Sequence, residues 1–122
     1  MRLENEIKVE KHGEIVIMDI RGDITSLSEV PLKNSYHNDA GREARKLIFK
    51  IEKEAYINSG GIALLIQILY ETRENKQNVA IAGVSPHYKK IFNMVGITKF
   101  AKLYDRLETA LERLDSQPDS HQ

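Results

Sequence analysis

The alternation of short apolar runs with segments of helical periodicity constrains the fold more than any other feature of this sequence. Three runs rich in β-branched or other apolar residues lie at 15–20, 47–51 and 79–83. A weaker alternating segment at 6–10 precedes them, and the turn residues His12 and Gly13 predict a hairpin between the first two strands. Strands that alternate with helices form parallel sheets through right-handed crossovers. We therefore predict an α/β domain with a mixed, mostly parallel sheet of about four to five strands and helices packed on it.

Helices are expected between the later strands and at the end of the chain. They are predicted at about 28–40, 59–74, 86–95 and 105–114, and a last edge strand at 99–103. Ser85 and Pro86 give the clearest helix start, with serine as the cap and proline at the first helical position. Asp105 with Glu108 resembles a capping box, with aspartate as the cap.

No internal repeat or linker divides the chain. We expect residues 1–114 to form one domain and the polar residues 115–122 to form a flexible C-terminal tail. In the first predicted helix, an apolar set could face the core, consisting of Leu27, Val30, Leu32 and Tyr36.

The predicted helix at 59–74 carries more apolar surface than a sheet alone can cover. Its apolar residues occupy well over half of its circumference; they are Ile62, Ala63, Leu64, Leu65, Ile66, Ile68, Leu69 and Tyr70. A helix that lies on a sheet needs an apolar stripe only a little over ~100° wide. Either flanking helices cover the excess, or part of it is left for a binding partner.

A small polar cluster stands at the start of this helix, at Asn58, Ser59, Gly60 and Gly61. The backbone N–H groups of a helix N-terminus lack intrahelical partners, and together with the helix dipole they favour a negative charge. Ser59 has two alternative roles. It could simply cap the helix, or it could also be phosphorylated, which would add about −1.5 to −2 charges at a tolerant helix end. The two glycines reduce helix stability, which suggests that something approaches the backbone closely there.

Composition excludes several classes of function. The chain of 122 residues has 18 basic and 18 acidic residues and no cysteine, so no overall charge favours nucleic acid or a membrane surface, and thiol chemistry is absent. Its four histidines lack metal-ligand spacing, and no base lies near Ser59 in the sequence. We expect no enzyme activity, metal or cofactor. The start of the sequence lacks the apolar region of a signal peptide, and a cytoplasmic location is expected.

Several motifs together resemble one family. They are Leu47 to Ile51 followed by Asn58 to Ala63, then Ala82 to Pro86 with Lys90 to Phe92, Gly96 and Ile97, and also Gly22 to Ile24. In this order and spacing they resemble the STAS domain of bacterial anti-sigma factor antagonists. The resemblance covers most of residues 6–114.

The resemblance implies a function and a mechanism. A domain of this family docks on an anti-sigma factor, typically a serine kinase of the histidine-kinase-like ATPase fold, and frees a sigma factor. The kinase phosphorylates the signature serine, here Ser59, which weakens docking, and a PP2C-type phosphatase resets the switch. ATP and Mg²⁺ would belong to the kinase.

The resemblance also places a docking surface around Ser59. Its residues are Asp23, Thr25, Asn58, Gly60, Gly61 and Ile62. Some of them depart from the commonest family pattern. Asn58 stands where aspartate is commonest, Lys50 replaces a frequent acidic residue, and Thr25 replaces a frequent aspartate. The acidic rim of many members is therefore thinned, with Asp23 as its survivor.

Three other functions remain open on the sequence. The domain could be an unphosphorylated STAS subunit that binds the cytoplasmic helix of a membrane permease, or part of a stressosome-type scaffold. A small serine hydrolase is the most distant alternative, since nothing in the sequence supplies a partner for Ser59 as nucleophile.

Overall fold

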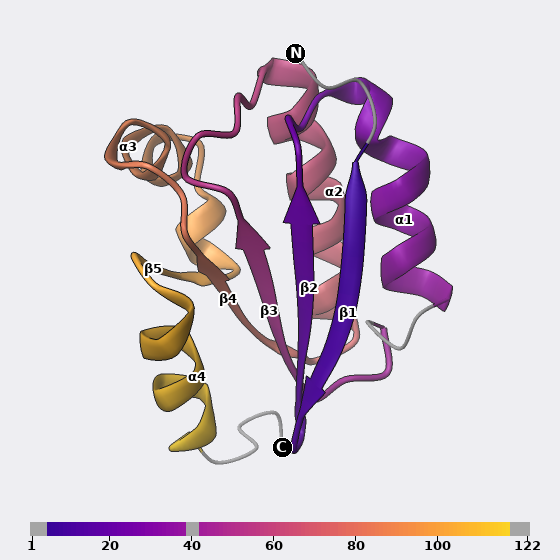
Figure 1. Cartoon of the computed structure of the whole chain (residues 1–122), viewed down its shortest axis with the longest axis vertical. Coiled ribbons are helices and arrows are strands. Elements are labelled where there is room, and N and C mark those ends of the chain that lie inside the picture. The colour runs from indigo at the N-terminus through magenta and orange to yellow at the C-terminus, as the bar shows by residue number, and fades with distance from the viewer. Residues whose placement is uncertain (1–4, 39–41, 118–122) are drawn as a thin grey trace.

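The computed structural model describes residues 5–38 and 42–117, which form one layered α/β unit around a five-stranded sheet. The strands are β1 (Glu6–His12), β2 (Ile15–Arg21), β3 (Lys46–Ile51), β4 (Asn78–Ala82) and β5 (Lys102–Tyr104). The helices are α1 (Glu29–Asn38), α2 (Ser59–Glu74), α3 (Pro86–Met94) and α4 (Leu107–Asp115), with 3-10 turns at Ser26–Ser28 and Ile97–Lys99. Figure 1 shows the sheet running from β1 at one edge to β5 at the other.

The predicted sheet topology is confirmed. β1 pairs with β2 antiparallel, and β2, β3, β4 and β5 pair in that order as parallel neighbours. The hairpin between β1 and β2 has a two-residue turn in which Gly13 has a φ of +62°. A positive φ at the first turn residue suits the right-handed twist of the two strands, and glycine adopts it without strain.

The two faces of the sheet are covered unequally. On one face, α1, α2 and α3 pack on a large apolar core that includes Val16, Met18 and Ile20 of β2. The alternate residues Ile15 and Ile17 belong to a smaller cluster under α4. Figure 1 shows α1 and α2 behind the sheet and α4 on the near side. Because side chains alternate across a strand, both faces of β2 can be apolar only where helices cover both.

The first helix differs from the prediction. The segment at 26–28 is a 3-10 turn, capped by Thr25, and α1 follows it without a break. The buried residues of α1 include Leu32 and Tyr36 as expected, but Leu27 and Val30 are 65% and 67% exposed. The expectation that these two residues face the core is therefore wrong. The predicted end of this helix at Ala40 lies outside the described residues.

Two local predictions near the end of the chain are also wrong. The predicted cap Asp105 lies before the cap position of α4, which is held by Arg106 without a side-chain hydrogen bond. Asp105 instead accepts a 2.6 Å hydrogen bond from Lys89 Nζ, and this bond lowers the pKa of the Asp105 carboxyl. The predicted strand at 99–103 begins later, because Gly96 turns the chain at a φ of +86° into a 3-10 turn that ends at Lys99.

The end of the described chain packs against the sheet. The buried Lys46 donates a 2.7 Å hydrogen bond from Nζ to the carbonyl oxygen of Gln117, just beyond α4. α4 ends at Asp115, the first residue of the predicted tail, and residues 118–122 lie outside the described residues, so the flexible tail stays a prediction. None of the described helices is long and apolar enough to cross a membrane.

Candidate functional site

The polar cluster predicted from the sequence lies where the loops after β2 and β3 meet, at the top of Figure 1. We call residues 56–62 the signature segment. Ile24 and Ile57 form an isolated parallel bridge, in which Ile24 N–H donates to Tyr56 O at 2.9 Å and Asn58 N–H donates to Ile24 O at 3.2 Å. This bridge joins the two loops, so that residues far apart in the sequence form one surface.

Asp23 and Thr25 help to shape this surface through hydrogen bonds to the backbone. Asp23, the acidic residue left of the predicted rim, is therefore not a free carboxylate. One Asp23 carboxylate oxygen, Oδ1, accepts a 3.0 Å hydrogen bond from Tyr56 N–H. Thr25 Oγ1 accepts from Leu27 N–H at 3.1 Å, and Ser28 Oγ accepts from Thr25 N–H at 3.1 Å. This reciprocal capping fixes the 3-10 turn beside the signature segment.

Asn58, and not Ser59, caps α2. Asn58 Oδ1 accepts a 2.8 Å hydrogen bond from Gly61 N–H, and the helix begins at Ser59. The alternative role of Ser59 as the cap is therefore wrong, because Asn58 occupies that position. The Ser59 side chain is exposed, and within the described part of the chain no hydrogen bond to its Oγ is found. A hydroxyl at the first helical residue is thus available to another molecule.

The two glycines allow the chain to approach itself closely. A Cβ at Gly61 would lie 2.1 Å from the carbonyl oxygen of Ile24, and one at Gly60 would lie 3.1 Å from Ser26 Cβ. The sequence indicated that something approaches the backbone here, and that partner is the protein's own segment at 24–26. The glycine pair therefore has a packing role, whatever else binds at this surface.

Exposed apolar side chains occur on the elements next to the start of α2, and the sequence analysis did not identify them as surface residues. Leu27 and Val30 lie on the 3-10 turn and the start of α1, and the 3-10 turn contacts α2. Tyr56, in the signature segment, is 54% exposed, and Ile62 is partly buried against the core. At 100° per residue, Leu27 and Val30 lie about 120° to 180° round a helix from the buried Leu32 and Tyr36, so helical periodicity itself places them on the exposed side. Exposed apolar residues around a reactive polar group are typical of a protein-docking surface.

Comparison with known families decides what kind of domain this is. The family model of the STAS domain matches residues 6–110. The chain belongs to the STAS family. This assignment agrees with the resemblance that the motifs of the sequence showed. It also agrees with the observed order of strands and helices.

Solved structures share the fold of this STAS domain. The crystal structure of an anti-sigma factor antagonist from Mycobacterium paratuberculosis matches with a TM-score of 0.79 at 17% identity, covering 95% of this chain and 98% of the other. The phosphorylated form of SpoIIAA, a Bacillus cell fate determinant, matches with a TM-score of 0.64 at 17% identity, covering 88% and 98%. A protein from Thermotoga maritima matches with a TM-score of 0.75 at 13% identity, covering 89% and 94%. At these identities the likeness establishes the fold.

The excess apolar surface of α2 is mostly covered in this STAS domain. Leu64, Leu65, Ile68 and Leu69 are buried. Tyr70, which is 55% exposed, lies against the Phe100 ring with centroids 5.0 Å apart, and the Arg73 guanidinium lies 4.8 Å from the same ring centroid. Flanking elements therefore account for most of the stripe.

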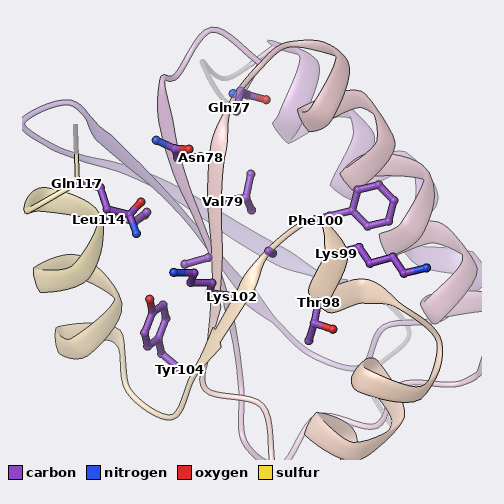
Figure 2. Close-up of a pocket in the computed structure, with 12 residues that line it drawn as sticks. Gln77, Asn78, Val79, Thr98, Lys99, Phe100, Lys102, Tyr104, Leu114 and Gln117 are labelled. Atoms are coloured by element: carbon purple, nitrogen blue, oxygen red, sulfur yellow. The ribbon is translucent and has the colours of Figure 1, made fainter. Parts of the chain in front are cut away.

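A hollow of about 240 Å³ lies at the far end of β4 from the signature segment, between β4, β5 and α4 (Figure 2). Its lining includes Lys102, Tyr104 and Gln77. The Gln77 amide, however, is bonded into the fold: Oε1 accepts from Tyr36 O–H at 2.5 Å, and Nε2 donates to Ala44 O at 2.6 Å. Among the described residues, no cluster of three or more histidine and carboxylate side chains could hold a metal ion. The hollow therefore lies apart from the surface around Ser59 and does not extend it.

The capping role of Asn58 predicts a clear difference between two substitutions. Asn58→Ala should lower the free energy of unfolding by about 1 kcal/mol, because Gly61 N–H loses its acceptor, whereas Asn58→Asp should leave it within about 0.5 kcal/mol. Urea unfolding followed by circular dichroism measures both. Equal losses for the two variants would contradict the assigned cap.

Proposed function

We propose that this STAS domain is an anti-sigma factor antagonist whose docking surface lies around Ser59 and is switched off by phosphorylation of that residue. One observation carries the proposal. Ser59 is exposed at the first residue of α2, while Asn58 satisfies the cap, so the hydroxyl is not needed to hold the helix. Chemical change at Ser59 can therefore alter binding without dismantling the fold.

The local charge supports phosphorylation as the switch. The start of α2 presents backbone N–H groups and the positive end of the helix dipole, which stabilise an anion. One of these groups, Gly61 N–H, is already bonded to Asn58. The first turn of the helix bears no acidic side chain that would repel a phosphate. A phosphate there would be tolerated by the folded domain. To a docking partner it would present a dianion beside the exposed apolar Leu27 and Tyr56, where uncompensated charge is costly to bury.

The proposed partners follow from the same role. The domain in its unmodified form docks on an anti-sigma factor that is also a serine kinase, and a PP2C-type phosphatase restores that form. The docking residues are the predicted set of Asp23, Thr25, Asn58, Gly60, Gly61 and Ile62, together with the exposed Leu27. Three of these act mainly by shaping the surface, because Asp23 and Asn58 are bonded to the backbone of the signature segment and Gly61 is buried against Ile24. We propose a cytoplasmic, regulatory role without catalysis.

Phosphopeptide mapping of the protein isolated from its own cells, during growth and under stress, tests the proposal. We expect phosphate on Ser59 in a proportion that changes with the condition, and none on the exposed Ser116 of the C-terminal end. Ser59 that stays unmodified in every condition would contradict the switch. The permease-subunit and scaffold functions would then become the leading alternatives.

A further inference from the structure

β1 is an outer strand whose free edge carries a full set of unused backbone groups. Because His12 and Ile15 flank the two-residue turn of the hairpin, they bond to each other, and every second residue of β1 from His12 backwards bonds to β2. Ile7, Val9 and Lys11 therefore direct their N–H and C=O groups away from the sheet. Among the described residues no hydrogen bond to these outward groups is found. Such an edge is a template for another strand.

The side chains of β1 are complementary to those of a second β1. Two copies related by a two-fold axis perpendicular to the sheet would pair antiparallel, with Val9 opposite Val9 of the other copy and with the outward backbone groups bonded to each other. Lys8 then lies opposite Glu10, and Glu6 lies opposite His12, each twice by symmetry. All four of these side chains are exposed and on one face of the strand. These are non-hydrogen-bonded pairs, in which facing side chains approach most closely.

The neighbouring registers are disfavoured by charge. A shift that centres the axis on Lys8 places Lys8 opposite Lys8 and Glu6 opposite Glu10. A shift that centres it on Glu10 places Glu10 opposite Glu10. Like charges directly opposite one another destabilise a strand pair. The register centred on Val9 therefore combines the longest overlap with attractive charge pairs, and the sequence of this strand selects it.

α1 lies beside the β1 edge (Figure 1), so pairing of two β1 strands would also bring the two copies of α1 close together. His37 of α1 binds Glu71 of α2, with Nε2 and Oε1 2.8 Å apart, which identifies the side of α1 that faces α2. At 100° per residue, Asn34, Asn38 and Pro31 lie about 60°, 100° and 120° round the helix from His37, on the flank between His37 and the buried Ser35. These residues are uncharged, so two copies of α1 brought together on the same face would not repel each other electrostatically.

We propose that β1 is a self-association edge, through which two copies of this chain form a two-fold dimer with one continuous sheet. No residue of the signature segment belongs to β1, and the proposed two-fold axis passes Val9, in the middle of the strand, away from Asn5, which bonds to Asp23 O at 2.9 Å. A single strand pair buries less than the ~1,200 Å² of a standard stable interface. We therefore expect a reversible dimer whose population depends on concentration in the micromolar to millimolar range.

Sedimentation equilibrium of the full chain over a concentration series tests the dimer, with charge variants of β1. Glu10→Lys places a second lysine side chain opposite Lys8, twice by symmetry, and should weaken dimerisation by at least about tenfold. The double variant Lys8→Glu with Glu10→Lys restores opposite charges and should recover dimerisation to within about threefold. Glu74→Lys, an equal charge change at an exposed position on α2, is the matched control and should have no effect.

A mixture of two single variants distinguishes contact between copies from a change within one copy. Lys8→Glu and Glu10→Lys should each be mostly monomeric alone, and together they should form a mixed dimer with opposite charges at every facing pair. Thermal unfolding of each variant verifies that the monomer is folded. A wild-type protein that stays monomeric to about 1 mM, or a dimer that Glu10→Lys leaves unchanged, would overturn the proposal; in that case the charges of β1 act to keep its edge unpaired.

Discussion

Replacing Gly61 by alanine is expected to lower the free energy of unfolding by about 3 kcal/mol or more, a large share of the stability of a small domain. The added Cβ would lie 2.1 Å from the carbonyl oxygen of Ile24 and 2.6 Å from its carbonyl carbon, which are backbone atoms that cannot move aside independently. Either α2 must shift away from the loop after β2, or the bridge between Ile24 and Ile57 must open. The midpoint of thermal unfolding should fall by roughly 10 °C.

Gly60→Ala is the matched control for this prediction. Its Cβ would meet Ser26 Cβ at 3.1 Å and the Ser26 backbone nitrogen at 3.2 Å, which are tight contacts with an exposed residue but about 1 Å longer than the contact at Gly61. Alanine also gains up to about 1 kcal/mol over glycine in a helix, so the net change should be within about 1 kcal/mol. Calorimetry of the two variants measures the difference. If Gly61→Ala were no more damaging than Gly60→Ala, the close approach of α2 to Ile24 would not limit stability.

If the proposed function holds, replacing Ser59 by aspartate is expected to weaken binding to the proposed partner kinase by at least about tenfold. The carboxylate would lie at the first residue of α2, among Tyr56, Leu27 and the other residues of the proposed docking surface, where burial of an unpaired charge is unfavourable. Ser59→Ala should bind with about the wild-type affinity, because within the described chain Oγ has no hydrogen bond to lose. Titration calorimetry with the kinase that co-purifies from the source cells measures both affinities.

The fold should be preserved in these variants, which makes the binding result interpretable. An acidic residue in the first turn of a helix is favourable by about 0.3–1 kcal/mol, so Ser59→Asp should unfold no earlier than the wild type. Ser116→Asp, at an exposed serine just beyond α4, adds the same charge away from the signature segment and should leave affinity unchanged. Equal binding by Ser59→Asp and Ser59→Ala would lead us to abandon the phosphorylation switch.

Most of the fold could be predicted because its signals are local. The apolar runs that became β2, β3 and β4 and the proline start of α3 lie where the sequence indicated. The serine cap of α3 is also confirmed, since Ser85 Oγ accepts from Tyr88 N–H at 3.4 Å. Strand alternation, helix periodicity and capping each depend on neighbouring residues, and such patterns can be identified without knowledge of the rest of the chain.

The weaker predictions failed where a side chain had a distant partner or where the helical period was misapplied. Asp105 and Glu108 match a capping box, yet Asp105 pairs with Lys89 on α3 and leaves the cap to Arg106. Leu27 and Val30 lie about 120° to 180° round a regular helix from Leu32 and Tyr36, so the four residues never formed one stripe, and the expectation that all four face the core misapplied the helical period. For Asp105, a contact with a distant residue, which sequence spacing does not specify, decided the outcome.

The sequence by itself determined the STAS order of strands and helices, the hairpin and the position of Ser59 at the start of α2, because local hydrophobic pattern and capping chemistry encode them. Only the tertiary structure decided why Gly61 is a glycine, which residue caps α2 and which apolar side chains surround the serine. Those answers depend on the backbone of Ile24, which lies far before Gly61 in the chain and approaches it only when the loops after β2 and β3 meet. A distance of that kind is set by packing across the sheet edge, and no local pattern contains it.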